Sequence, residues 1–161
     1  MKFKNLEMTG FKSFSEKTTV LIEKGLTGIV GPNGCGKSNI VEALRWCMGE
    51  NSAKSMRGSG MEDVIFSGTS NRPSKNISEV SLLLDNLEKN GPSQYKEFDE
   101  ISIKRKIEKD KGSKYFINEK EVRARDVQTF FADLSTGAHS PSLISQGRIG
   151  QLVTAKPIER K

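Results

Sequence analysis

The residue types and spacing of one glycine-rich segment suit the binding of a phosphate group. Residues 31–38 read Gly-Pro-Asn-Gly-Cys-Gly-Lys-Ser, which fits a glycine, four further residues and then Gly-Lys-Ser or Gly-Lys-Thr. The three glycines let the backbone curl, so that successive N–H groups point at one anion. The pattern therefore predicts a phosphate-binding loop that comprises Gly31, Pro32, Asn33, Gly34, Cys35, Gly36, Lys37 and Ser38.

The last two residues of this loop carry the side chains that a nucleoside triphosphate requires. Lys37 adds a compact positive charge for the β- and γ-phosphates, and the Ser38 hydroxyl can complete the coordination of Mg²⁺. Residues 26–30 are typical of a short buried strand, and residues 38–48 carry apolar side chains at helical spacing. The phosphate would therefore sit at the N-terminus of a helix. We expect the ligands of this site to be ATP and Mg²⁺.

Basic residues are concentrated in the second half of the chain. Between residues 101 and 125 there are nine lysines and arginines and four acidic residues, which gives +5 of the formal net charge of +6. Such a surface on a nucleotide-binding domain suggests a polyanion such as DNA, while a solvated hairpin face would have the same composition. The candidates for sequence-independent phosphate-backbone contacts are Lys104, Arg105, Lys106, Lys120, Arg123 and Arg125.

The composition is typical of a single cytoplasmic domain. A length of 161 residues is enough to bury one core. No apolar run approaches the roughly 18 residues needed to cross a bilayer, and the N-terminus lacks the apolar core of a signal peptide. We therefore expect a cytoplasmic protein without a membrane partner.

The chain is expected to form an α/β fold with a mixed sheet, and its periodicity indicates where the strands and helices lie. Residues 101–107 alternate between the two faces of a half-exposed strand, and residues 114–117 complete a basic β-hairpin. Asp126 can cap a helix with apolar residues at helical spacing. Further strands are expected at residues 3–8, 18–22, 62–66 and 77–84.

One further pattern suggests a different kind of enzyme. Residues 82–85 read Leu-Leu-Leu-Asp, and an Asp at the end of an apolar strand often holds the metal of a P-loop enzyme. With Asp85 in that role the chain could be a self-contained kinase. However, Asn86 follows where an adjacent carboxylate could have polarised a water, and Asp-Asn after a strand is ordinary turn chemistry.

Four segments around the loop resemble the motifs of one family. They are Gly-Phe-Lys-Ser-Phe at residues 10–14, Ser-Ala-Lys-Ser-Met-Arg-Gly at 52–58, Met-Glu-Asp-Val-Ile-Phe at 61–66 and Leu-Ile-Ser-Gln-Gly-Arg at 143–148. In this order and spacing the chain resembles the N-terminal half of the ATPase head of a bacterial SMC (structural maintenance of chromosomes) protein, a relative of the ABC ATPases. The resemblance spans essentially all 161 residues.

The resemblance implies roles for residues outside the loop. Gln146 matches the glutamine that joins the Mg²⁺ shell and orients the attacking water, so Gln146 and Lys37 are the predicted catalytic residues. Arg57 matches an arginine that reaches the nucleotide, and a guanidinium suits a bidentate phosphate contact. Lys12 and Ser13 match a segment near the phosphates or the base.

The resemblance also implies that the site is shared with sequence beyond this chain. In the family, the signature motif, the metal-binding Asp and the catalytic Glu come from a C-terminal lobe. We expect residues 1–155 to form the N-terminal lobe and residues 156–161 to start an outgoing coiled-coil helix. The implied partners are the second lobe, a second copy of the protein, kleisin-type subunits and DNA, and the implied function is chromosome condensation and partition. The isolated chain should bind ATP without hydrolysing it.

Other classes of ATPase share parts of this pattern. A DNA-repair ATPase head of the Rad50 or RecN kind would have the same phosphate-binding loop and glutamine, although residues 10–14 and 52–58 favour the SMC family. A membrane-transport ATPase subunit would normally have an aromatic residue to stack on adenine and no basic hairpin.

Overall fold

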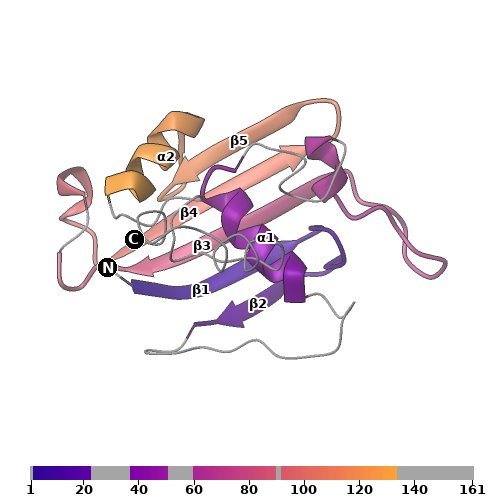
Figure 1. Ribbon diagram of the computed structural model, residues 1–161, viewed down its shortest axis with the longest axis horizontal. Coiled ribbons are helices and arrows are strands. Elements are labelled where there is room, and N and C mark those ends of the chain that lie inside the picture. The colour runs from indigo at the N-terminus through magenta and orange to yellow at the C-terminus, as the bar shows by residue number, and fades with distance from the viewer. Residues whose placement is uncertain (1, 23–36, 51–59, 90–91, 134–161) are drawn as a thin grey trace, which may run out of the picture.

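The computed structural model describes residues 2–22, 37–50, 60–89 and 92–133, and a six-stranded sheet forms its centre (Figure 1). The strand order is β2-β1-β3-β4-β5-β6, and every described pairing is antiparallel. The strand expected at residues 26–30 lies outside the described residues. The elements are β1 (Lys2–Thr9), β2 (Thr18–Leu21), α1 (Lys37–Cys47), β3 (Ile77–Asp85), β4 (Glu100–Glu108), β5 (Gly112–Ile117), β6 (Lys120–Val122) and α2 (Ala124–Asp133).

Both α-helices pack on one face of the sheet, which we call the inner face (Figure 1). Buried and partly exposed side chains alternate along β3 and β4, because successive residues of a strand point to opposite faces. The register places Leu82 of β3 beside Ile103 of β4, and both side chains are fully buried. α1 contacts β3 and β4, and α2 contacts β5. The side chains of β3 and β4 that point to the other, outer face remain partly exposed, as the alternation of residues 101–107 predicts.

The strand expected at residues 62–66 is wrong, because this segment contains a 3₁₀ helix at Met61–Val64. The Asp63 carboxylate accepts a hydrogen bond from the Gly60 N–H at 3.0 Å, which stabilises the turn locally. Ile65 alone forms a bridge, to Phe11. The apolar side chains of residues 62–66 therefore pack into the core, although the segment does not form a strand of the sheet.

The basic hairpin is confirmed and extends into a third strand. β5 and β6 are joined by Asn118 and Glu119, whose φ angles are +49° and +66°. Two residues in the left-handed region make the tight turn that matches the twist of paired strands. The Asn118 side chain accepts a hydrogen bond from the Ser102 N–H at 2.9 Å, which ties the turn to β4.

The second helix begins at Ala124, slightly before the predicted cap at Asp126. Asp126 lies in the first turn, and its carboxylate accepts a hydrogen bond from the Arg123 N–H at 2.9 Å. Asp126 therefore stabilises the helix start from inside the helix, by reaching back to the residue that precedes it.

Candidate nucleotide-binding site

The helix after the predicted phosphate-binding loop begins at Lys37. Ser38 follows in the first turn, and this turn contains no acidic residue that would repel an anion. The first N–H groups of a helix lack intrahelical acceptors and carry the positive end of the helix dipole, so they favour a phosphate. Residues 31–36 of the loop, together with Arg57 and Gln146, lie outside the described residues, and their roles stay predictions.

The segment that contains Lys12 and Ser13 packs beside the first half of α1. The Nζ atom of Lys12 lies 2.7 Å from Oε2 of Glu42, and these side chains are only 14% and 7% exposed. The side-chain amide of Asn39 donates a hydrogen bond to the Ser13 hydroxyl at 2.9 Å. The structure therefore brings both predicted residues next to the helix that starts at Lys37. The family resemblance implies that this segment lies near the phosphates or the base, and that role stays a prediction.

Arg105 lies inside the protein, on the inner face of β4, and is only 2% exposed. Its guanidinium carbon lies 4.6 Å from the ring centre of Trp46 and 4.7 Å from that of Tyr115. Its Nη1 atom donates hydrogen bonds to the backbone oxygens of Trp46 at 3.0 Å and Glu50 at 2.7 Å. The prediction that Arg105 contacts DNA is therefore wrong, because the guanidinium is enclosed by rings and carbonyl groups.

Around this guanidinium, at the C-terminal end of α1, several polar side chains form a layer that is buried from solvent. Burial lowers the pKa of Arg105 and raises the pKa of the Cys47 thiol to about 12. The thiol is placed to donate to the backbone oxygen of Ile103 at 3.3 Å. Arg45 and Glu50 form an ion pair at 3.1 Å with side chains 5% and 3% exposed. Charged groups here are held by hydrogen bonds in place of water.

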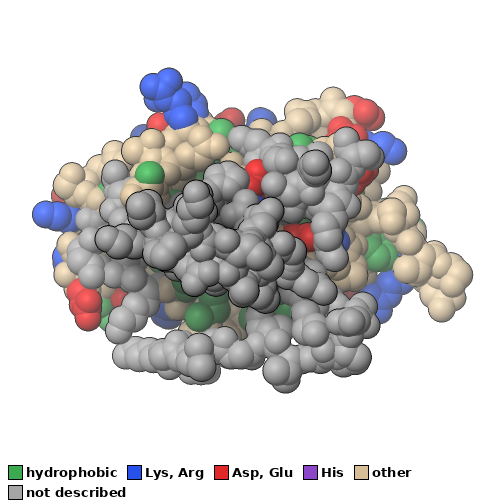
Figure 2. Space-filling view, in the orientation of Figure 1, with side chains coloured by type: hydrophobic (Ala, Val, Ile, Leu, Met, Phe, Trp, Pro, Cys, Tyr) green, Lys and Arg blue, Asp and Glu red, His purple; other side chains and the backbone are tan. Residues whose placement is uncertain are grey.

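The other basic candidates lie at the surface, where two of them already have acidic neighbours. Lys104 points to the outer face, and its Nζ lies 3.0 Å from a carboxylate oxygen of Glu119. Arg123 contacts Asp126 at 3.4 Å. On the side seen in Figure 2, lysine and arginine side chains lie around the rim of the view, with acidic side chains among them. The remaining candidates are Lys106, which is partly exposed, and Lys120 and Arg125, which are exposed.

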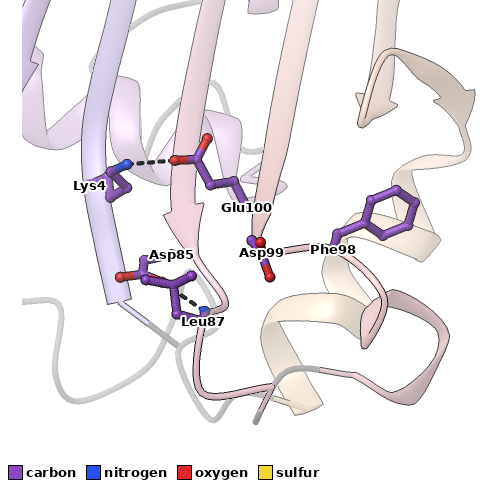
Figure 3. A pocket seen from close by; sticks show the side chains of 6 residues that line it. All are labelled: Lys4, Asp85, Leu87, Phe98, Asp99 and Glu100. Carbon is purple, nitrogen blue, oxygen red and sulfur yellow. Dashed lines mark hydrogen bonds and ion pairs between the residues drawn. The ribbon is translucent and has the colours of Figure 1, made fainter.

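Asp85 occupies a turn at one end of the sheet, beside a surface hollow (Figure 3). Its carboxylate accepts a hydrogen bond from the Leu87 N–H at 2.8 Å, which is the turn chemistry expected of an Asp after a strand. Asp85 pairs with Lys2 at the start of β1, whereas Lys12 follows the other end of β1. A strand of eight residues spans about 25 Å. Asp85 is therefore far from the start of α1, and the kinase alternative loses its metal ligand.

The described residues contain neither a cluster of metal ligands nor a membrane-spanning helix. No group of three or more His, Cys, Asp and Glu side chains in that part of the chain could hold a metal ion. No helix within the same residues is long and apolar enough to cross a membrane.

The polar layer around Arg105 is the feature that sequence reasoning missed. A signal for it was present, because Arg105 occupies the same alternate positions of β4 as Ile103 and Ile107. A charged residue in register with buried isoleucines faces the core, where it needs buried acceptors. Its partners Trp46 and Glu50 are distant in sequence and could not be identified from the pattern.

Comparison with known proteins places the chain beside chromosome partition proteins. Residues 2–147 match a family model described as RecF/RecN/SMC N terminal domain. The chain is 56% identical over 161 residues to the chromosome partition protein Smc of Cereibacter sphaeroides, and 55% identical over 161 residues to that of Rhodopseudomonas palustris. Each alignment covers 100% of this chain but only 14% of the relative.

Solved SMC heads have the same fold. A head of Smc bound to the C-winged helix domain of ScpA matches with a TM-score of 0.90 and 32% identity, over 99% of this chain and 48% of that chain. A second structure, from work on "ATP-driven dimerization and DNA stimulated activation of SMC ATPases", matches with a TM-score of 0.89 and 31% identity, over 99% of this chain and 95% of that chain. The fold class expected from the resemblance is confirmed.

Proposed function

The chain belongs to the RecF/RecN/SMC N-terminal domain family, and on that premise we propose that it is the ATP-binding lobe of an SMC-type ATPase head that acts in chromosome condensation and partition. The observation that carries the proposal is the start of α1 at Lys37, directly after the glycine-rich loop. The contacts of Lys12 and Ser13 with the first half of this helix support it. The chain spans 14% of the length of its Smc relatives, so the activity of the whole protein is part of the proposal.

Each predicted site residue has a distinct role in this proposal. The Lys37 ammonium and the first N–H groups of α1 would hold the β- and γ-phosphates, and the Ser38 hydroxyl would bind Mg²⁺. When bound, Mg²⁺ would supply positive charge that offsets the negative charge of the phosphates. Arg57 would hold a phosphate oxygen through its guanidinium fork, while Gln146 would bind the metal and orient a water. A helix start without an acidic residue fits this set of ligands.

The proposal includes partners that complete the site. Residues 1–155 would form the N-terminal lobe, and residues 156–161 would begin a coiled-coil helix. A C-terminal lobe of the same head and a second head would enclose the nucleotide, and the cycle of engagement and release would act on DNA in the nucleoid. The similarity to an Smc head that was solved with a domain of ScpA supports a kleisin-type partner. For the 161-residue chain alone, we expect ATP binding without turnover.

Titration calorimetry with ATP and Mg²⁺ tests the proposal on the 161-residue chain. Lys37→Ala should weaken binding by about tenfold or more, because the site loses its charge on the phosphates. Lys17→Ala, which removes a lysine 66% exposed at the surface, is the matched control and should bind as the unchanged chain does. Equal affinity of the Lys37→Ala variant would refute the proposal, and so would ATP turnover that disappears in Asp85→Ala.

A further inference from the structure

We propose that Arg105 is a positioning residue for the nucleotide site: it fixes the C-terminal end of α1 to the β4–β5 hairpin and so sets the position of the first N–H groups at the other end of α1. This inference rests on the proposed function. It concerns a residue that contacts no nucleotide itself, because Arg105 lies at the opposite end of α1 from Lys37.

The first support is the set of atoms that Arg105 holds. The last carbonyl groups of a helix lack intrahelical donors, and a positive charge there also interacts favourably with the negative end of the helix dipole. The Nη1 atom of Arg105 donates to the oxygen of Trp46, in the last turn of α1, and to that of Glu50, just beyond it. One guanidinium from the sheet thus caps both α1 and the chain that leaves it.

The second support is the rigidity of this contact. The guanidinium lies between the rings of Trp46 and Tyr115, so its plane has little freedom to turn. Its Nε and Nη2 atoms contact the Ser113 hydroxyl at 3.4 Å and 3.3 Å. Lysine cannot reproduce this arrangement, because an ammonium group has no planar fork with which to reach carbonyl and hydroxyl groups on opposite sides.

The third support is mechanical. α1 has 11 residues, so it is a stiff rod about 16 Å long. The contacts of Lys12 with Glu42 hold its first half, and the contacts of Arg105 hold its end. If the C-terminal end of α1 is released from Arg105, the helix can tilt about the contact between Lys12 and Glu42. Such a tilt would misplace the N–H groups that face the phosphates, and displacements of about 1 Å at a site have large effects.

The experiment compares Arg105→Lys with Cys47→Ala in the 161-residue chain. Cys47 is buried in the same layer, so the control variant disturbs the packing of α1 but keeps the cap on its carbonyl groups. We measure the dissociation constant of a fluorescent ATP analogue with Mg²⁺, the melting temperature, and the emission of Trp46, which is the only tryptophan of the chain.

Arg105→Lys should weaken binding of the analogue by about fivefold or more and shift the Trp46 emission, whereas Cys47→Ala should lower the melting temperature with a change in affinity below about twofold. Unchanged affinity of Arg105→Lys would overturn the inference, and so would an equal loss of affinity in both variants. If Arg105→Lys does not fold, Ser113→Ala tests the inference in its place. Ser113 is exposed, so we expect this variant to fold. A weaker affinity with shifted emission supports the inference, and no change in either refutes it. Failure of the unchanged chain to bind the analogue would instead refute the proposed function.

Discussion

Lys104 and Arg105 are neighbours on β4, yet they have opposite surroundings. Lys104 points to the outer face, keeps 22% of its side chain exposed and has Glu119 as a partner at 3.0 Å. Arg105 points to the inner face and is enclosed by two aromatic rings and the end of α1. Successive residues of a strand face opposite sides, so one step along the chain separates a solvated charge from a buried one.

The difference shows that the formal net charge of a segment overstates the positive charge at its surface. The segment from residue 101 to 125 has a formal charge of +5, but one of its cations is inside the protein and others are close to carboxylates. The cationic area available to a polyanion is therefore smaller than the composition indicates. The charge that is removed from the surface stabilises the end of the helix that carries the proposed nucleotide site.

The largest expected contrast between the faces comes from a pair of adjacent leucines. Leu82 is fully buried on the inner face, and Leu83 is partly exposed on the outer face. Leu82→Ala should lower the free energy of unfolding by about 2–5 kcal/mol because it leaves a cavity, whereas Leu83→Ala should cost less than about 1 kcal/mol. Urea denaturation of both variants measures this. Equal losses would break the comparison, because they would show that the outer face is also packed.

A smaller effect is expected at the tight turn between β5 and β6, on the exposed side of the comparison. Glu119 has a φ of +66°, which glycine adopts without strain. Glu119→Gly should therefore raise the free energy of unfolding by about 0.5–1 kcal/mol. This figure is the net gain once the loss of the exposed ion pair with Lys104 is subtracted. Glu119→Gln is the matched control for thermal denaturation, because it removes the charge and keeps the strain. A similar gain in the control would show that charge and not backbone strain is responsible.

The smallest effect is expected at the exposed start of α2. Hydrogen bonds from the Arg123 N–H and the Arg123 side chain hold the pKa of Asp126 below its ordinary value. A lowered pKa in the folded state stabilises the protein above the unfolded value near 3.8, and this contribution is lost as the pH falls through the lowered pKa. Asp126→Asn should make the melting temperature less dependent on pH in that acidic range. Arg123→Met keeps the hydrogen bond from the backbone N–H and should retain most of the pH dependence of the melting temperature. Loss of this dependence in Arg123→Met would show that the guanidinium lowers the pKa of Asp126.

Local patterns predicted much of the sheet and part of the site. The alternation of residues 101–107 predicted β4, and helical spacing after the glycine-rich loop predicted α1. Lys12 and Ser13, which the family resemblance indicates, contact α1, and their part in nucleotide binding stays a prediction. These features depend on residues that are close in sequence or on motifs of fixed spacing.

One error arose from residues distant in sequence, and the other from a local side-chain hydrogen bond. Arg105 was assigned to the surface because its charge was considered without the register that places it beside Tyr115. Residues 62–66 have the composition of a strand, but the hydrogen bond from the Gly60 N–H to Asp63 favours a turn. A tertiary contact decided the first case, and a local side-chain hydrogen bond decided the second.

The strand order also determines when each part of the chain can fold as it leaves the ribosome. β3, β4 and β5 each pair with the next strand along the chain, and such local pairings form quickly. β1 emerges first, but its pairing with β3 must wait for the whole segment between Thr9 and Ile77. α1 lies within that segment. Arg105 of β4, which caps the end of α1, is synthesised later still. The position of α1 on the sheet is thus expected to be fixed only once β4 has been synthesised.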